Sequence, residues 1–209
     1  MLLIGMFDSP FVRRVAVSLK LLGFEFEHAN WSVGKDHAQI CRYSPLGRVP
    51  VLVLEDGEVL TESSAILDHL DSLVGPERAL VPSRGIARRQ VLQLTSLAIG
   101  AGEKGRDVIY ERIVRPPEKR HEPWAQRCRS QMHGALSEIE RQQSQRAGTW
   151  LVGDHLTQAD ITVTCVWALL RDAVALQDGL YPALAALTER CEALPEFVAT
   201  RLPWFAAEV

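Results

Sequence analysis

The first residue with chemical potential in this chain is a hydroxyl close to its start. Ser9 follows an apolar run, residues 2–7, and directly precedes Pro10 and a segment with helical spacing. Serine is a common N-cap and proline favours the first helical position, so the hydroxyl should lie beside unpaired N–H groups at the positive end of a helix. Such a position favours anions. The alternative is that Ser9 caps its helix and does nothing more.

Metal and disulfide chemistry find little support in the sequence. The four cysteines are far apart and form none of the close pairs typical of zinc or redox sites, and the six histidines show no metal-ligand spacing. The cysteines are Cys41, Cys128, Cys165 and Cys191. We expect reduced cysteines and no metal site.

Composition and charge describe an ordinary globular protein. The 209 residues are 47% apolar and 23% charged, enough for one large or two small domains. The net charge of −3 argues against a general nucleic-acid or anionic-membrane binder. No secretory signal opens the chain, and its longest apolar run, near residues 161–170, is too short to span a bilayer. These features predict a cytoplasmic protein that binds neither nucleic acid nor membrane.

The first 75 residues have the pattern of an α/β domain. A strand, a helix that ends at Gly23 and a second strand over residues 24–28 suggest a right-handed βαβ unit, followed by a short helix over residues 35–43. A hairpin through Asp56-Gly57 and a helix that starts at residues 61–64 complete the order βαβαββα. This is the order of a thioredoxin-like domain, which we place at residues 1–75.

Residues 76–85 are the best linker in the chain, and residues 86–209 contain no convincing strand signal. The first helix there is expected to be interrupted by three glycines, at 100, 102 and 105, and to stop before residue 116; the second covers residues 123–146. Thr157 and Asp160 form a capping-box pattern before a helix that is apolar nearly all round. Two shorter helices begin at Pro182 and Pro195. We therefore expect an all-α C-terminal domain with the helix after Thr157 at its centre.

Three short motifs occur in order along this framework. They are Ser9-Pro10-Phe11-Val12-Arg13, Gly47-Arg48-Val49-Pro50-Val51-Leu52 and Glu62-Ser63. With the domain order and the capping box, they make essentially the whole chain resemble the cytosolic glutathione transferases (the GST superfamily). The first motif is most similar to serine-type members, including bacterial homologues and the plant tau class.

The resemblance implies a role for each matching residue. Ser9 would be catalytic and donate a hydrogen bond to the sulfur of glutathione, the co-substrate. Val49, before a cis bond to Pro50, would pair with the cysteinyl backbone of glutathione, whereas an edge-strand proline without a ligand is the alternative. Glu62 and Ser63 would bind the γ-glutamyl group, unless Thr61 or Ser63 is a plain helix cap. The implied glutathione-binding residues are Phe11, Lys35, Arg48, Val49, Pro50, Glu62 and Ser63, with Arg48 and Lys35 near the glycyl carboxylate.

The second substrate is expected between the two domains. By resemblance, Phe11 and the fourth helix, through Arg106 and Tyr110, would wall the electrophile pocket. Trp167 or Trp204 would complete the wall, unless Trp167 belongs to the core, as its apolar helix favours. The sequence suggests no role for Asp8, and its negative charge would disfavour a thiolate if its side chain faced the site.

The leading interpretation is a homodimeric glutathione transferase whose thiolate attacks a small hydrophobic electrophile. One alternative is an enzyme with the same glutathione site that catalyses an isomerase, lyase or peroxidase reaction. The other is a non-catalytic binding or regulatory protein with the same fold.

Overall fold

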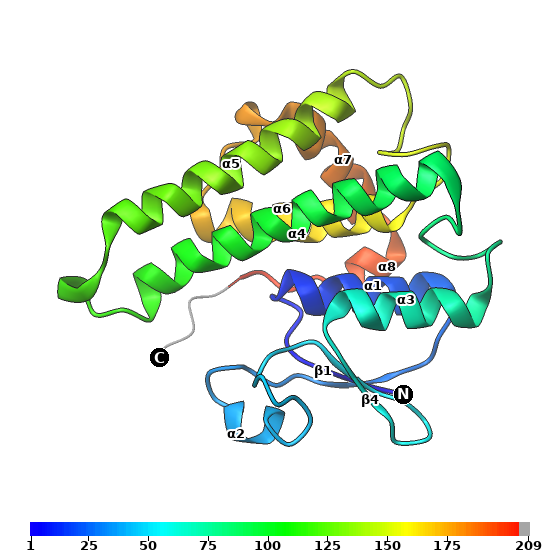
Figure 1. Cartoon of the computed structure of the whole chain (residues 1–209), viewed down its shortest axis with the longest axis horizontal. Helices are drawn as coiled ribbons and strands as arrows, with labels where there is room; N and C mark the ends of the chain where they lie inside the picture. The colour runs from blue at the N-terminus through cyan, green and yellow to red at the C-terminus, as the bar shows by residue number, and fades with distance from the viewer. Residues whose placement is uncertain (205–209) are drawn as a thin grey trace.

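A four-stranded mixed sheet lies at the centre of the N-terminal half in the computed structural model, which describes residues 1–204 (Figure 1). The strands are β1 (Leu2–Ile4), β2 (Glu27–Ala29), β3 (Val51–Val53) and β4 (Val59–Thr61), in the spatial order β2-β1-β3-β4. Strand β1 pairs parallel to β2 and antiparallel to β3, and β3 pairs antiparallel to β4. In this register Leu3 lies opposite His28 on one side and Leu52 on the other.

Helices cover both faces of the sheet. They are α1 (Pro10–Leu22), α2 (His37–Ile40) and α3 (Ser63–Val74). Because side chains alternate along a strand, Leu3 and Leu52 pack with α1 and α3, while Ile4 and Val51 pack with Ile40 of α2. The predicted thioredoxin-like order βαβαββα, followed by an all-helical region, is confirmed.

The observed strands and the second helix are shorter than predicted. Strand β1 ends at Ile4 because Gly5 adopts a φ of 129° and turns the chain, although the apolar run continues to Phe7. Strand β2 begins at Glu27 instead of residue 24, and α2 covers only part of the predicted range. Hydrophobic pattern locates each element well and its ends less well.

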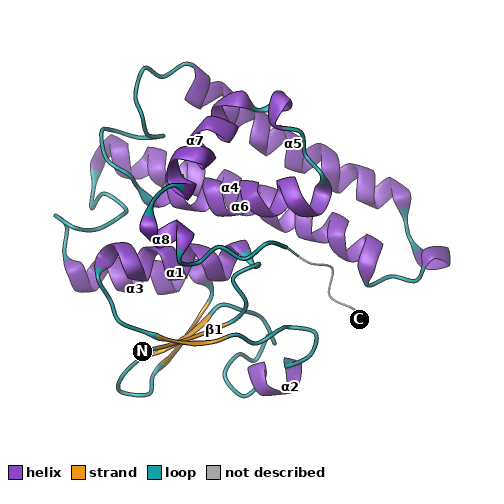
Figure 2. Ribbon diagram, turned by 180° about the vertical axis from the view of Figure 1, so that it is seen from behind, coloured by secondary structure: helices purple, strands orange, loops and turns teal. Residues whose placement is uncertain are grey.

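The C-terminal half is helical throughout its described part (Figure 2). Its helices are α4 (Gly85–Ile113), α5 (Glu122–Ser144), α6 (Gln158–Val174), α7 (Pro182–Glu192) and α8 (Pro195–Val198), with 3₁₀ turns at Pro117–Lys119 and Asp178–Leu180. No helix within residues 1–204 is long and apolar enough to cross a membrane.

Helix α6 is the central element of this half, as predicted. Thirteen of its 17 residues are buried, and it packs against α1, α4 and α7. Helix α4 is continuous over 29 residues despite its glycines. A side chain at Gly105 would overlap Leu170, and one at Gly102 would lie 3.2 Å from Val166, so these glycines allow α4 and α6 to approach closely.

Two buried carboxylates stabilise the helical half and its junction with α1. Asp160 accepts hydrogen bonds of 2.8 Å from the backbone N–H of Leu151 and from both the N–H and the hydroxyl of Thr157. Glu192 of α7 accepts two hydrogen bonds, of 2.6 and 2.7 Å, from the guanidinium of Arg13 on α1.

Candidate functional site

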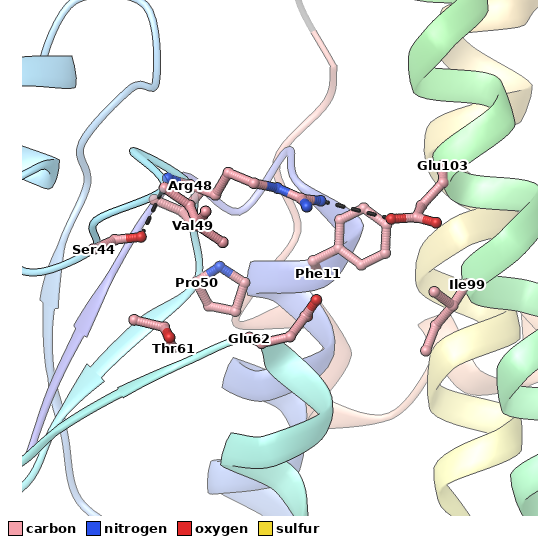
Figure 3. A pocket seen from close by; sticks show the side chains of 10 residues that line it. Phe11, Ser44, Arg48, Val49, Pro50, Thr61, Glu62, Ile99 and Glu103 are labelled. Atoms are coloured by element: carbon pink, nitrogen blue, oxygen red, sulfur yellow. Dashed lines mark hydrogen bonds and ion pairs between the residues drawn. The ribbon is translucent and has the colours of Figure 1, made fainter.

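A cavity lies between the two halves, beside the edge of α1 (Figure 3). The N-terminal half contributes Phe11, the segment before β3 and the junction of β4 with α3, and α4 contributes Ile99 and Glu103. The lining residues are Phe11, Ser44, Leu46, Arg48, Val49, Pro50, Thr61, Glu62, Ile99 and Glu103. Four residues expected to bind glutathione besides Phe11 are therefore collected here: Arg48, Val49, Pro50 and Glu62.

Ser9 occupies the N-cap position of α1, with φ of −72° and ψ of 121°, and its carbonyl accepts the first helical hydrogen bond from Arg13 N–H. Its hydroxyl makes no capping hydrogen bond. The side chain is half-buried and lines neither described cavity, but its chain neighbours do: Pro10 and Asp8 lie at a second cavity, and Phe11 at the first. The hydroxyl thus lies at the start of a helix and is not committed to the cap.

The peptide bond between Val49 and Pro50 is cis, as expected. Both residues line the first cavity, and Val49 precedes the ladder of β3, which begins at Val51. The backbone N–H of Arg48 is bound by the Ser44 hydroxyl at 3.3 Å. The segment from Ser44 to Pro50 therefore forms one wall of the cavity.

Glu62 is the N-cap of α3, and neither Thr61 nor Ser63, the caps considered as an alternative, takes that position. Its carboxylate accepts hydrogen bonds from the N–H of Ser63, at 2.7 Å, and from the Ser63 hydroxyl, at 3.2 Å. Its φ of 73° is unusual for a residue with a side chain. A carboxylate oxygen therefore already accepts the Ser63 N–H at this helix start, and Ser63 is buried.

The two predicted cations have different surroundings. The Arg48 guanidinium lies 3.7 Å from the Glu103 carboxylate of α4, across the mouth of the cavity (Figure 3). Lys35 is exposed in the turn before α2 and lines neither described cavity. The structure therefore groups Arg48, but not Lys35, with the other candidate residues.

Three of the residues predicted to wall the electrophile pocket lie apart from the two described cavities. Trp167 is fully buried and packs edge-on against Tyr181, with ring centroids 5.5 Å apart, so it belongs to the core of the helical half. Arg106 pairs with Asp107 at 3.2 Å, and Tyr110 is exposed. None of the three lines either described cavity, and α4 instead contributes Ile99 and Glu103, earlier along the helix, to the first cavity.

The second cavity lies on the α6 side of Ser9. It is lined by Phe7, Asp8, Pro10, Arg13, Cys165, Ala168, Leu169, Asp172, Leu202 and Trp204. The chain after α8 returns past the start of α1 and supplies the last two residues (Figure 2). Burial raises the pKa of the Asp8 carboxyl, although its own N–H and that of Ser9 oppose the shift.

Sequence reasoning missed the residues that α4 and α6 bring to these cavities. On α6, positions 165, 168, 169 and 172 lie on one face of the helix. This spacing would have identified them as neighbours in one cavity, but only once that face was known to pack against α1. For Glu103, nothing local indicates a partner 55 positions away at Arg48. Within residues 1–204, no group of three or more His, Cys, Asp or Glu side chains could hold a metal ion.

Comparison with known proteins places this arrangement in a family. The glutathione S-transferase N-terminal domain model matches residues 3–78, and the C-terminal domain model matches residues 108–195. The uncharacterized GST-like protein YibF of Escherichia coli is 30% identical over 140 residues, which cover 67% of this chain and 68% of YibF. Probable maleylacetoacetate isomerase 1 of Drosophila melanogaster is 27% identical over 90% of this chain and 74% of its own.

A solved structure gives the same result. The glutathione S-transferase of Methylobacterium radiotolerans, crystallised with glutathione sulfonate, superposes with a TM-score of 0.88 at 31% identity, over 95% of this chain and 93% of its own. Fold and sequence therefore agree that this chain belongs to the glutathione S-transferase family.

Proposed function

We propose that the protein is a glutathione transferase in which Ser9 stabilises the thiolate of bound glutathione. The observation that carries this proposal is the Ser9 hydroxyl, which lies at the start of α1, makes no capping hydrogen bond and has chain neighbours in two cavities. A hydroxyl in this position can donate its proton to a sulfur anion.

The energies suit such a role. A free thiol with a pKa of about 8.5 is only a few per cent ionised near neutral pH, and lowering that pKa by about two units requires about 2.7 kcal/mol. A hydrogen bond to a charged group contributes about 1.5–3 kcal/mol, and a helix N-terminus about 0.3–1 kcal/mol, or about 2 when partly buried. One serine at a helix start is therefore nearly sufficient.

The first cavity suits the peptide part of glutathione. Backbone groups at Val49 would pair with the cysteinyl residue as an added strand does. The γ-glutamyl carboxylate would bind at Ser63 and the N-terminus of α3. There it would replace the Glu62 carboxylate, which would turn toward the ligand's ammonium group. Arg48 would bind the glycyl carboxylate, and Phe11 would pack against the ligand; Lys35 is less well placed.

In the proposed reaction, the sulfur lone pair forms a carbon–sulfur bond with the electrophile. The leaving group departs with its bonding electrons, or, in an addition, a carbon takes up a proton. We assign glutathione binding to residues 1–75 and the electrophile mainly to the helical half, residues 86–209. We further propose a serine-type, tau-like enzyme that acts as a cytoplasmic homodimer.

A second candidate is a glutathione-dependent isomerase. Relatives named as probable maleylacetoacetate isomerases match about nine-tenths of this chain at 24–27% identity, which favours this class. An isomerase returns its glutathione, whereas a transferase consumes one glutathione per product. Measuring free thiol during turnover of maleylacetoacetate and of neutral alkylating electrophiles distinguishes the two.

The proposal is tested by titrating glutathione and following thiolate ultraviolet absorbance against pH. We expect the pKa of the bound thiol to lie about two units below that of free glutathione in the wild type, and to rise by at least about one unit in Ser9→Ala. Ser137→Ala, an exposed serine of α5, is the matched control and should leave the pKa unchanged. Failure to bind glutathione would refute the proposed function, and an unshifted pKa in Ser9→Ala would refute the role of Ser9.

A further inference from the structure

The second cavity combines an apolar body with an acidic lining. Phe7, Leu169, Leu202 and Trp204 supply hydrocarbon and aromatic surface. The lining also contains two carboxylates, Asp8 from the loop before α1 and Asp172 from the last turn of α6. Asp8 is the chain neighbour of Ser9, so a substituent on a sulfur at Ser9 would lie close to this lining.

The cations near this cavity are already engaged. Arg13 is the one basic residue in the lining, and its guanidinium binds the Glu192 carboxylate at 2.6 and 2.7 Å and the Phe197 carbonyl at 3.1 Å. Arg201, next to Leu202 in the chain, also approaches Glu192, at 3.6 Å, so both arginines pair with Glu192 and neither forms an ion pair with Asp8 or Asp172.

Two further arginines lie at the rim. Arg171 approaches Asp172 at 3.4 Å, but both side chains are more than a third exposed, so this pair is weak. Arg112 lies over the Trp204 ring, 5.8 Å from its centroid, and donates to the Ala173 carbonyl at 2.8 Å. Neither arginine pairs with Asp8.

The charged form of the Asp8 carboxyl is energetically unfavourable where it lies. Burial is the main cause of the rise in its pKa, so its carboxylate is poorly solvated. A cation or a hydrogen-bond donor placed in the cavity relieves that cost, and a second anion increases it.

We propose that the second cavity receives the electrophile and that Asp8 and Asp172 are its specificity-determining residues. They select electrophiles that have a cationic or hydrogen-bond-donating group on an aromatic or hydrocarbon body. Electrophiles that carry a carboxylate are disfavoured. This inference rests on the proposed function and deepens it. It also favours transfer to a cationic or neutral electrophile over isomerisation of an acid.

Binding of glutathione conjugates tests the inference without requiring turnover. The probes are three S-substituted glutathiones: S-benzylglutathione, its para-aminomethyl derivative and its para-carboxy derivative. Unsubstituted glutathione reports on the peptide site alone. We expect calorimetry to show the ammonium conjugate binding at least about tenfold more tightly than the carboxylate conjugate, with the neutral conjugate between them.

Asp8→Asn and Asp172→Asn remove each charge while keeping the side-chain shape. Each should reduce the ratio between the ammonium and carboxylate conjugates by about threefold or more, and the double variant should bring it near one. Asp154→Asn, in the exposed loop before α6, is the matched control and should preserve the ratio. Melting temperature and affinity for glutathione itself show whether each variant is folded.

The outcomes separate the two proposals. If glutathione and all its conjugates fail to bind, the proposed function is wrong and this inference falls with it. If glutathione binds but the three conjugates bind equally, the inference alone is overturned. A ratio that persists in the double variant would overturn the assignment to Asp8 and Asp172.

Discussion

Ser9 and the four cysteines show how position decides the chemistry of a side chain. Ser9 is half-buried at a helix start, where its hydroxyl makes no capping hydrogen bond. Cys128, Cys165 and Cys191 are buried, and Cys41 is exposed on the chain just after α2. Burial raises the pKa of the Cys165 and Cys191 thiols to about 12, and that of Cys128 in the same direction.

This difference predicts selective alkylation. Because the thiolate is the nucleophile, thiols whose pKa is raised by burial stay protonated and unreactive at mildly alkaline pH. Iodoacetamide should therefore modify Cys41 first in the native protein, and all four cysteines in urea. Peptide mass spectrometry measures the order. Modification of Cys165 before Cys41 in the folded protein would contradict the burial described here.

For single residues, a local motif was enough to predict the backbone position. Ser9 is the N-cap of α1 with Pro10 after it, and the bond between Val49 and Pro50 is cis, as expected. Asp8, Asp172 and Glu103 were not predicted as cavity residues, because their position depends on which helix faces meet, and that is decided by packing between distant segments.

Among the elements, α6 shows how a local pattern can specify a structure. The capping-box spacing predicted the start of the helix, and Asp160 does accept the N–H of Thr157. Its third hydrogen bond, from Leu151, lies outside the helix and joins the preceding loop to it. Helix α4 shows the opposite case, since its glycines suggested an interruption and instead allow close contact with Leu170. The low helix propensity of glycine was outweighed here by the packing of α4 against α6.

We expect Asp160→Asn to lower the free energy of unfolding by about 1–3 kcal/mol, because an amide cannot accept all three hydrogen bonds and leaves buried donors unpaired. Urea denaturation followed by circular dichroism measures the loss. Asp154→Asn, a few residues earlier and exposed, should change the free energy little. Equal stability of the two variants would show that the cap is not a stabilising feature of α6.

For the whole molecule, the contact between Arg13 and Glu192 joins segments 179 positions apart. Their side chains are only 5% and 9% exposed, so the pair is shielded from water and salt. It links α1 of the N-terminal half to α7 of the helical half. No sequence pattern could have predicted it, since each residue alone has the pattern of an ordinary helix-surface charge.

Breaking this pair should be costly, whereas replacing it should be much less so. We expect Glu192→Leu to lower the free energy of unfolding by about 3–5 kcal/mol, because it leaves the buried charge of Arg13 unpaired. Arg13→Met should cause a smaller loss, because Glu192 keeps the exposed Arg201 at 3.6 Å. The double variant should be more stable than the sum of the two losses implies, as a double-mutant cycle in urea would show. Glu138→Gln, in an exposed ion pair with Arg141, should cause a clearly smaller loss. Additive effects of the first two substitutions would contradict a coupled pair.

The ion pair between Arg48 and Glu103 spans the same two halves in a different setting. Its atoms are 3.7 Å apart and its side chains are 49% and 41% exposed, so it contributes little to stability. An anion that binds Arg48 competes with Glu103 for the same guanidinium. An anion bound in the cavity would then break this ion pair between the halves. The two halves would move more freely relative to each other when the cavity is occupied than when it is empty.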